Sequence, residues 1–171
     1  MIAIREADLA DARALAEVHV CSWQAAYRGE LPDDYLDGLS VDEREAQWTE
    51  WLTADEPRAA VLVATDDDGL VVGFTGVGPS RDDDAAAGTG EVRSIYLLPR
   101  WFGKGVGRGL FTIANERLRD LGYTRATLWV LATNERSRRF YEKAGWTFDG
   151  TEGTHQNECL NMPIKRYATD L

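Results

Sequence analysis

The residues that most directly suggest chemistry are four glycines that alternate between positions 103 and 109, with Lys104 and Arg108 among them. An apolar run over 92–99 precedes them, and a helical pattern over 110–121 follows. Glycine costs a helix about 1 kcal/mol relative to alanine, so its repetition where a helix begins indicates that bare backbone N–H groups are needed there. Such amides bind anions, and a phosphate is the anion that suits this arrangement best.

Two well-known phosphate-binding loops do not fit this segment. A Walker A loop requires Ser or Thr after its lysine, whereas Lys104 is followed by Gly105. A dinucleotide fingerprint that starts at Gly103 or Gly105 reaches Arg108 or Leu110 where it needs its last glycine. Both failures disfavour a nucleotide-binding hydrolase. A flexible surface turn remains the alternative explanation for the glycines alone.

The charge of the chain is unevenly distributed. The net charge is −10, which argues against nucleic acid and against an anionic membrane surface as partners. The segment 91–143 holds eleven basic and five acidic residues, so it carries +6 and the remainder carries −16. A small polyanionic ligand held near the glycine run, within an acidic protein, fits both observations.

Length and cysteine usage set further bounds. A chain of 171 residues with 44% hydrophobic content predicts one domain over residues 1–171. Cys21 and Cys159 show no metal-ligand spacing, and the chain opens on a strand-like Ile-Ala-Ile instead of a basic and then apolar leader. These features predict a reduced, cytoplasmic protein without a metal.

The elements that must position the glycine run follow from hydrophobic periodicity and capping signals. Asp8 and Ser40 are predicted helix caps, and Gly78 to Gly90, with its aspartate run, is the one segment that looks mobile. The order β-α-α-β-β-β-α-β-α-β-β indicates one mixed α/β sheet with helices on both faces. The predicted strands are 2–5, 60–65, 70–77, 91–98, 127–131, 146–150 and 158–167, and the predicted helices are 8–23, 40–52, 110–121 and 134–144.

Three motifs in order are similar to those of the GNAT acetyltransferase superfamily. They are EVRSIYLLP at 91–99, GKGVGR at 103–108, and the pattern of Asn, Ser, Phe-Tyr-Glu-Lys and Gly-Trp over 134–146. The resemblance implies an α+β fold whose mostly antiparallel central sheet splays open at the cofactor site. It departs from the family at Phe102, where an Arg or Gln is usual, which weakens arguments from side-chain contacts there.

The resemblance also implies the acyl donor and the residues that hold it. The donor is acetyl-CoA, its pyrophosphate resting on backbone amides of the glycine run. Asn134 is expected to cap its helix and also to bond the pantetheine or phosphate part of the cofactor. The expected cofactor-binding residues are Ile95, Tyr96, Leu97, Gly103, Lys104, Gly105, Val106, Gly107, Arg108 and Asn134.

Acetyl transfer to an amine needs a neutral amine, stabilisation of an oxyanion and a proton for the departing thiolate. An alkylamine with a pKa of about 10.4 is neutral in roughly one molecule in 10³ at pH 7, so a base is useful. Glu91, at the family's frequent carboxylate position, is the predicted base, with a solvated strand-end glutamate as an equal alternative. Tyr141 matches the family's general acid, with a core aromatic as its alternative, and the Leu97 amide is the predicted oxyanion donor.

The acceptor is not encoded in any motif. It is expected near the first helices, where five residues are candidates for the lining, each with a core or surface role as the alternative: Trp23, Tyr27, Arg28, Trp48 and His155. His19, on an apolar helix face, is interpreted as a satisfied core histidine. The resemblance therefore implies an N-acetyltransferase that moves an acetyl group to a small-molecule or peptide primary amine by direct attack in a ternary complex. A non-catalytic acyl-CoA-binding sensor is the alternative, and a homodimer is left open.

Overall fold

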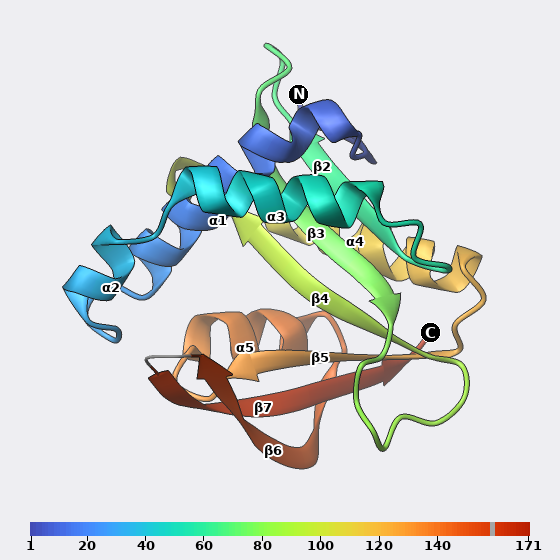
Figure 1. The fold of residues 1–171 in the computed structure, drawn as a ribbon. Coiled ribbons are helices and arrows are strands. Elements are labelled where there is room, and N and C mark those ends of the chain that lie inside the picture. Colours follow the sequence, from blue (N-terminus) through green and yellow to red (C-terminus); the bar gives the residue numbers. More distant parts are fainter. Residues whose placement is uncertain (158–159) are drawn as a thin grey trace.

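The computed structural model describes residues 1–157 and 160–171. It shows a seven-stranded sheet in the order β1-β2-β3-β4-β5-β7-β6, with helices on both faces (Figure 1). The strands are β1 (Ala3–Glu6), β2 (Ala60–Thr65), β3 (Val71–Pro79), β4 (Thr89–Leu97), β5 (Arg125–Leu131), β6 (Thr147–Asn157) and β7 (Leu160–Asp170). The helices are α1 (Ala12–Ala26), α2 (Asp33–Asp37), α3 (Val41–Thr53), α4 (Val106–Asp120) and α5 (Glu135–Lys143), with short 3₁₀ turns at η1 (Leu9–Asp11) and η2 (Pro99–Trp101).

Local capping signals account for where several of these elements begin. Ser40 Oγ accepts the N–H of Glu43 at 3.2 Å and starts α3, as predicted. Asp8 also caps, but the turn that it starts is η1, which leads into α1. Gly122, with φ +85°, ends α4. The short helix α2 was not predicted, because the aromatic, glycine and proline residues just before it, over 27–32, indicate a connector.

The sheet is antiparallel at every junction except one. β4 and β5 pair in parallel only over Thr89–Glu91 and Arg125–Thr127. Figure 1 shows the two strands diverging beyond this point, β4 toward α1 and β5 toward α5. On its other edge β4 carries one extra residue, Arg93, opposite the step from Gly76 to Val77 of β3, and such a bulge bends a strand. The predicted fold class and its splayed sheet are confirmed.

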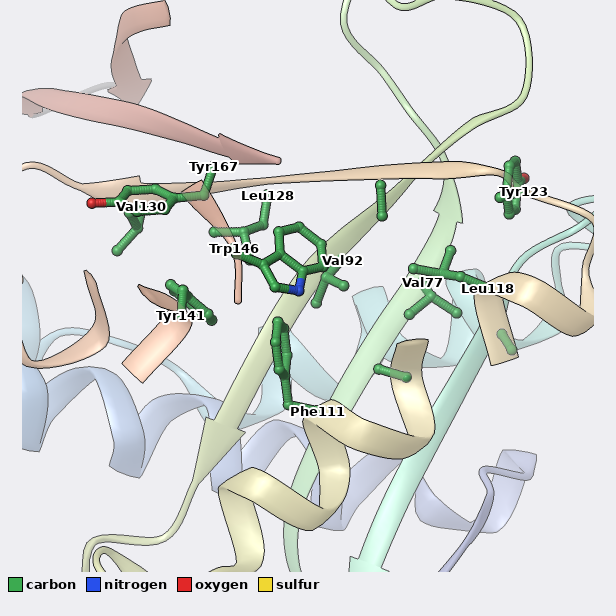
Figure 2. Packing of buried hydrophobic residues seen from close by; sticks show 13 residues of the cluster. Val77, Val92, Phe111, Leu118, Tyr123, Leu128, Val130, Tyr141, Trp146 and Tyr167 are labelled. Carbon is green, nitrogen blue, oxygen red and sulfur yellow. The ribbon is translucent and has the colours of Figure 1, made fainter. Parts of the chain in front are cut away.

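Separate clusters of buried side chains lie on the two faces. On one face, α1 and α3 pack on β2 and β3 around Phe74 and Trp48. On the other face, Phe111 of α4 lies 5.3 Å, between ring centroids, from both Trp146 and Tyr141 (Figure 2). The second cluster thus joins α4 to α5 and β5.

The connection from β3 to β4 is tied down at its aspartates. Asp82 and Asp84 both pair with Arg166 of β7. The segment predicted to be mobile is therefore anchored at its centre, by a residue more than 80 positions away.

Within residues 1–157 and 160–171, no three His, Cys, Asp or Glu side chains are grouped so that they could hold a metal, and no helix is long and apolar enough to cross a bilayer. Cys21 is an exposed free thiol, and Cys159 lies outside the described residues.

Candidate active site

A groove of about 1560 Å³ opens where β4 and β5 separate, walled by both strands and by parts of α1, α4 and α5. Leu98 donates its N–H to the carbonyl oxygen of Val72 on β3 at 2.9 Å. Successive amides of a strand point to opposite sides, so the N–H of Leu97 points away from β3 and toward the opening. This is the orientation that an oxyanion donor at Leu97 requires.

The cofactor residues of β4 divide between the two faces of the sheet. Ile95 and Leu97 pack with the α4 side, whereas the ring of Tyr96 stacks on His19 of α1 at 4.9 Å. All three strand residues line the groove. Burial lowers the pKa of His19 to about 3, so its ring is neutral. His19 is half-buried and not part of the fully buried core, and its Nδ1 has no hydrogen-bond partner among the described residues, so the prediction of a satisfied core histidine is not confirmed.

The glycine run forms a cradle of free amides at the start of α4. Gly105 is the N-cap with φ +83°, and Gly103 also has positive φ, +75°. The first amide bonded within the helix is that of Gly109, to the Gly105 carbonyl at 3.0 Å, so the three preceding N–H groups have no partner within the helix. A Cβ on Gly103 or Gly105 would meet no atom within 4 Å, so space remains for a phosphate. The cradle therefore fits the pyrophosphate of an acyl-CoA.

The side chains around this cradle differ in their access to the groove. Arg108 is exposed and lines it, whereas Val106 is buried in the core under the helix. Lys104 lies over the Trp101 ring, 5.0 Å from its centroid, and is not part of the lining. Phe102, where the family usually has Arg or Gln, carries the guanidinium of Arg136 over its ring at 4.6 Å. A cation is thereby present at this edge of the groove.

Glu91 lies at the last residue pair that β4 and β5 share, where the groove begins. Only 8% of its surface is exposed, and its Oε2 accepts the backbone N–H of Arg81 at 3.0 Å. Burial is the main cause that raises the pKa of Glu91, and the charge of Asp82 raises it further. A solvated strand-end carboxylate would not have this environment. A raised pKa is what a general base working near neutral pH requires.

Tyr141 projects from α5 into the same groove and is 7% exposed. Its ring packs against Phe111 and lies 6.4 Å, between centroids, from Tyr167. Burial raises the pKa of Tyr141, so its phenol keeps its proton at neutral pH. The side chain is therefore both a core aromatic and a protonated group at the groove wall.

A hydrogen-bond chain fixes α5 to β7. Tyr167 donates its hydroxyl proton to Glu142 Oε1 at 2.8 Å and accepts Arg138 Nε–H at 3.2 Å. At the start of the helix, Asn134 Oδ1 accepts the N–H of Ser137 at 3.1 Å, so its predicted capping role is confirmed. Asn134 also lines the groove, which leaves its contact with the cofactor a prediction.

The five candidates for the acceptor lining are only partly brought together. Trp23 and Tyr27 form an edge-to-face pair at 4.9 Å and line the groove with His155. Arg28 is not in the lining, because it pairs on the surface with the acidic side chains of α2. Trp48 is not in the lining either, because α3 packs against α1 and turns it into the core beside Phe74. The lining role expected for these two residues does not hold.

Two polar side chains near the groove were not foreseen. Ser22 of α1 is buried, and its Oγ lies 2.7 Å from the carbonyl oxygen of Leu97. Arg166 of β7 is surrounded by three aspartates. Neither residue belongs to a motif, and no local pattern marks either one, since both act on partners far away in the sequence.

Comparison with known proteins agrees with this geometry. The model of the acetyltransferase (GNAT) family matches residues 16–146. Uncharacterized N-acetyltransferase YuaI from Bacillus subtilis (strain 168) is 36% identical over 134 residues, which cover 78% of this chain and 74% of YuaI. Aminoglycoside N(6')-acetyltransferase type 1 from Stenotrophomonas maltophilia is 29% identical over 168 residues, 96% of this chain and 95% of the relative. The crystal structure of PaiA N-acetyltransferase from Thermoplasma acidophilum in complex with coenzyme A has a TM-score of 0.75 at 20% identity, covering 100% of this chain and 99% of PaiA.

The chain belongs to the acetyltransferase (GNAT) family. It is an acyltransferase, and acetyl-CoA is its acyl donor.

Proposed function

We propose that this protein transfers the acetyl group of acetyl-CoA to a primary amine by direct attack within a ternary complex. The observation that carries the proposal is the placement of Glu91, Tyr141 and the Leu97 amide around one groove. We also propose that residues 1–171 form a single domain and that the protein is cytoplasmic.

Glu91 acts as the base. The acceptor reaches the groove as an ammonium ion, and Glu91 takes one proton through a water molecule, which frees the nitrogen lone pair to form the new C–N bond. Its raised pKa makes it a better proton acceptor than an ordinary glutamate. As the carbonyl π electrons move onto oxygen, the Leu97 N–H stabilises the negative charge.

Tyr141 acts as the acid. When the C–S bond breaks, its electron pair stays on sulfur, and the thiolate would be left in a poorly solvated site. Burial disfavours such an anion, so the Tyr141 phenol gives its proton to the sulfur while the oxyanion re-forms the C=O bond. The second proton of the attacking nitrogen then passes to the Tyr141 oxygen, which restores the phenol and leaves the amide. The phenol is protonated throughout the neutral range because its own pKa is raised.

The acceptor enters from the side of α1. Trp23 and Tyr27 offer aromatic surfaces there, and Glu91 supplies a negative charge. These features suit the cationic amine of a small molecule or peptide, and the aminoglycoside acetyltransferase relative supports a small-molecule amine.

The test is the release of coenzyme A thiol from acetyl-CoA across a library of primary amines, with and without protein. We expect release that depends on the amine and produces the acetylated amine in equal amount. Tight binding of acetyl-CoA without release for any amine would support the acyl-CoA sensor instead.

A further inference from the structure

Arg166 holds the β3–β4 connection, residues 80–88, against the C-terminal strands. Its guanidinium donates two hydrogen bonds to Asp84, at 2.6 and 2.9 Å, and one to Asp82 Oδ2 at 3.1 Å. Its Nε–H donates to Asp149 Oδ2 of β6 at 2.6 Å. Arg166 is only 9% exposed, and these hydrogen bonds hold its pKa above the ordinary arginine value. One buried cation thus serves three carboxylates from two segments of the chain.

Trp129 completes the clamp from β5. Its indole N–H donates to Asp82 Oδ1 at 2.9 Å, so both carboxylate oxygens of Asp82 are bonded. Trp129 lies opposite Arg166 in the β5–β7 pairing and carries the guanidinium 5.6 Å from its ring centroid. Trp129 also lines the groove, so the clamp lies at the groove wall.

The clamp is linked to the proposed base, Glu91, through the residue next to Asp82. Arg81, next to Asp82 in sequence, donates its backbone N–H to Glu91. The charged groups that act on Glu91 are Arg81, Asp82 and Arg93, and Arg93 is itself held by Glu56 through two bonds of 2.7 Å. Asp82 is the one negative group of the three, and Arg166 is its counterion.

We propose that Arg166 is a positioning residue for Glu91: it fixes the Asp82 segment so that the Arg81 amide reaches the Glu91 carboxylate, and it offsets the negative charge beside that carboxylate. The inference rests on the assignment of Glu91 as the base. Without Arg166, Asp82 would keep its bond from Trp129 but lose its counterion beside the buried Glu91 carboxylate, and Glu91 would become harder to ionise.

The experiment measures kcat/KM for the amine against pH in the whole protein, for the wild type and for Arg166→Met. We expect the acidic limb of the profile to move up by about one pH unit, the scale of one neighbouring charge. That shift corresponds to a roughly tenfold loss of kcat/KM on the limb, with KM for acetyl-CoA unchanged because the cradle lies at α4. Adding Asp82→Asn to Arg166→Met should move the limb back toward that of the wild type.

A matched control exists at Arg5, which makes a two-bond clamp with the buried Asp11, at 2.7 and 2.8 Å, outside the groove lining. Arg5→Met should lower stability and leave the acidic limb in place. If Arg166→Met does not fold, Arg166→Lys replaces it, since lysine keeps the charge but cannot hold three carboxylates at once. The Arg166→Lys variant should show a smaller upward shift of the acidic limb.

A carboxyl-carbon NMR titration of Glu91 separates the inference from the proposed function. A titration that moves upward in the Arg166 variant supports the coupling whatever the activity shows. If Glu91→Gln then leaves the pH profile unchanged, the base assignment fails on its own. A Glu91 titration that is the same in folded Arg166→Met and the wild type would overturn the inference.

Discussion

Ser22 Oγ lies 2.7 Å from the carbonyl oxygen of Leu97 and 2.6 Å from that of Val18, so one hydroxyl proton is shared between α1 and the end of β4. The Leu97 carbonyl belongs to the residue whose N–H faces the groove. Because this carbonyl and that N–H flank the same Cα, a hydroxyl that holds the carbonyl in place also restricts the proposed oxyanion donor.

Replacing Ser22 with alanine should therefore affect both stability and turnover. A buried carbonyl without its partner costs about 1–3 kcal/mol, so the melting temperature should fall. We expect kcat to fall further than KM for acetyl-CoA rises. Thr49, which is exposed on α3 and makes the corresponding bond to the Glu45 carbonyl, is the control: Thr49→Ala should leave kcat intact. Equal kcat in the Ser22 and Thr49 variants would show that Ser22 does not support the proposed oxyanion donor.

Acetyl-CoA should raise the melting temperature, and Gly105→Glu should abolish that rise. The substitution forces a side chain into a left-handed backbone, at about 1–2 kcal/mol, and places a negative charge where the pyrophosphate is expected. Gly69, with φ +80° and equally open surroundings in the β2–β3 hairpin, gives a matched control. Gly69→Glu should lower stability by a similar amount and keep the shift. Gly107→Val should also abolish the rise in melting temperature; its Cβ would lie 3.1 Å from Leu97 Cδ1, a tight contact that requires the leucine side chain to move.

Calorimetry on folded variants checks this prediction. Unchanged acetyl-CoA affinity in Gly105→Glu or Gly107→Val would show that the cradle does not hold the phosphates.

Glu91→Gln should lower kcat/KM mainly below neutral pH, and less at high pH, where free amine is abundant. The same substitution should raise the stability of the fold at neutral pH while it lowers the activity. The folded-state pKa of Glu91 is raised, so the folded protein binds the proton more tightly, and stability falls as pH rises from the unfolded value of about 4.3 through the folded value. Glutamine removes this loss and can still accept the Arg81 N–H. The variant should melt higher than the wild type at pH 7 and similarly at pH 4; a lower melting temperature at pH 7 would contradict the raised pKa.

Tyr141→Phe should retain acetyl-CoA affinity while turnover falls by roughly 10- to 10³-fold, the scale of general-acid catalysis. The defect should shrink in alkaline buffer, because a thiol with a pKa of about 8.5 leaves more readily as the thiolate there. Tyr123 belongs to the same buried cluster, but its hydroxyl donates to the Arg58 carbonyl. Tyr123→Phe should lower stability without this loss of turnover. Normal turnover of Tyr141→Phe at pH 7 would leave Tyr141 a packing residue.

His19 should make the fold sensitive to acid. Its folded pKa is about 3, whereas an unfolded histidine titrates near 6.5, so the unfolded chain binds more protons between these values. Stability is therefore lost as pH falls through this window and changes no further, on account of His19, below pH 3. His19→Phe should flatten the fall in denaturation midpoint between pH 6.5 and 4. An equally steep fall in the variant would show that other groups cause it.

The order of elements apart from α2, and the glycine turn that starts α4, could be predicted because each depends on residues close in sequence. Glu91 and Tyr141 were identified through the motifs of the resemblance, and their roles stay predictions. Trp48 and Arg28 show why the rest could not. The sequence pattern of an aromatic residue on a helix is the same whether the side chain faces the core or a groove. Trp48 is buried only because α3 packs on α1. Arg28 is occupied by Asp33 and Asp37 of α2, a helix that the sequence did not reveal.

The early parting of β4 and β5 also bears on how this protein avoids aggregation. Separated strands expose edges, and an exposed edge is a template on which another chain can add a strand. Here the amides of β4 lie inside a groove whose walls include residues of α1 and α5. Walls on both sides leave an incoming β-strand less access to these amides than an open sheet edge would. The fold can therefore keep hydrogen-bonding groups available for a ligand in the middle of its sheet without offering them to other proteins.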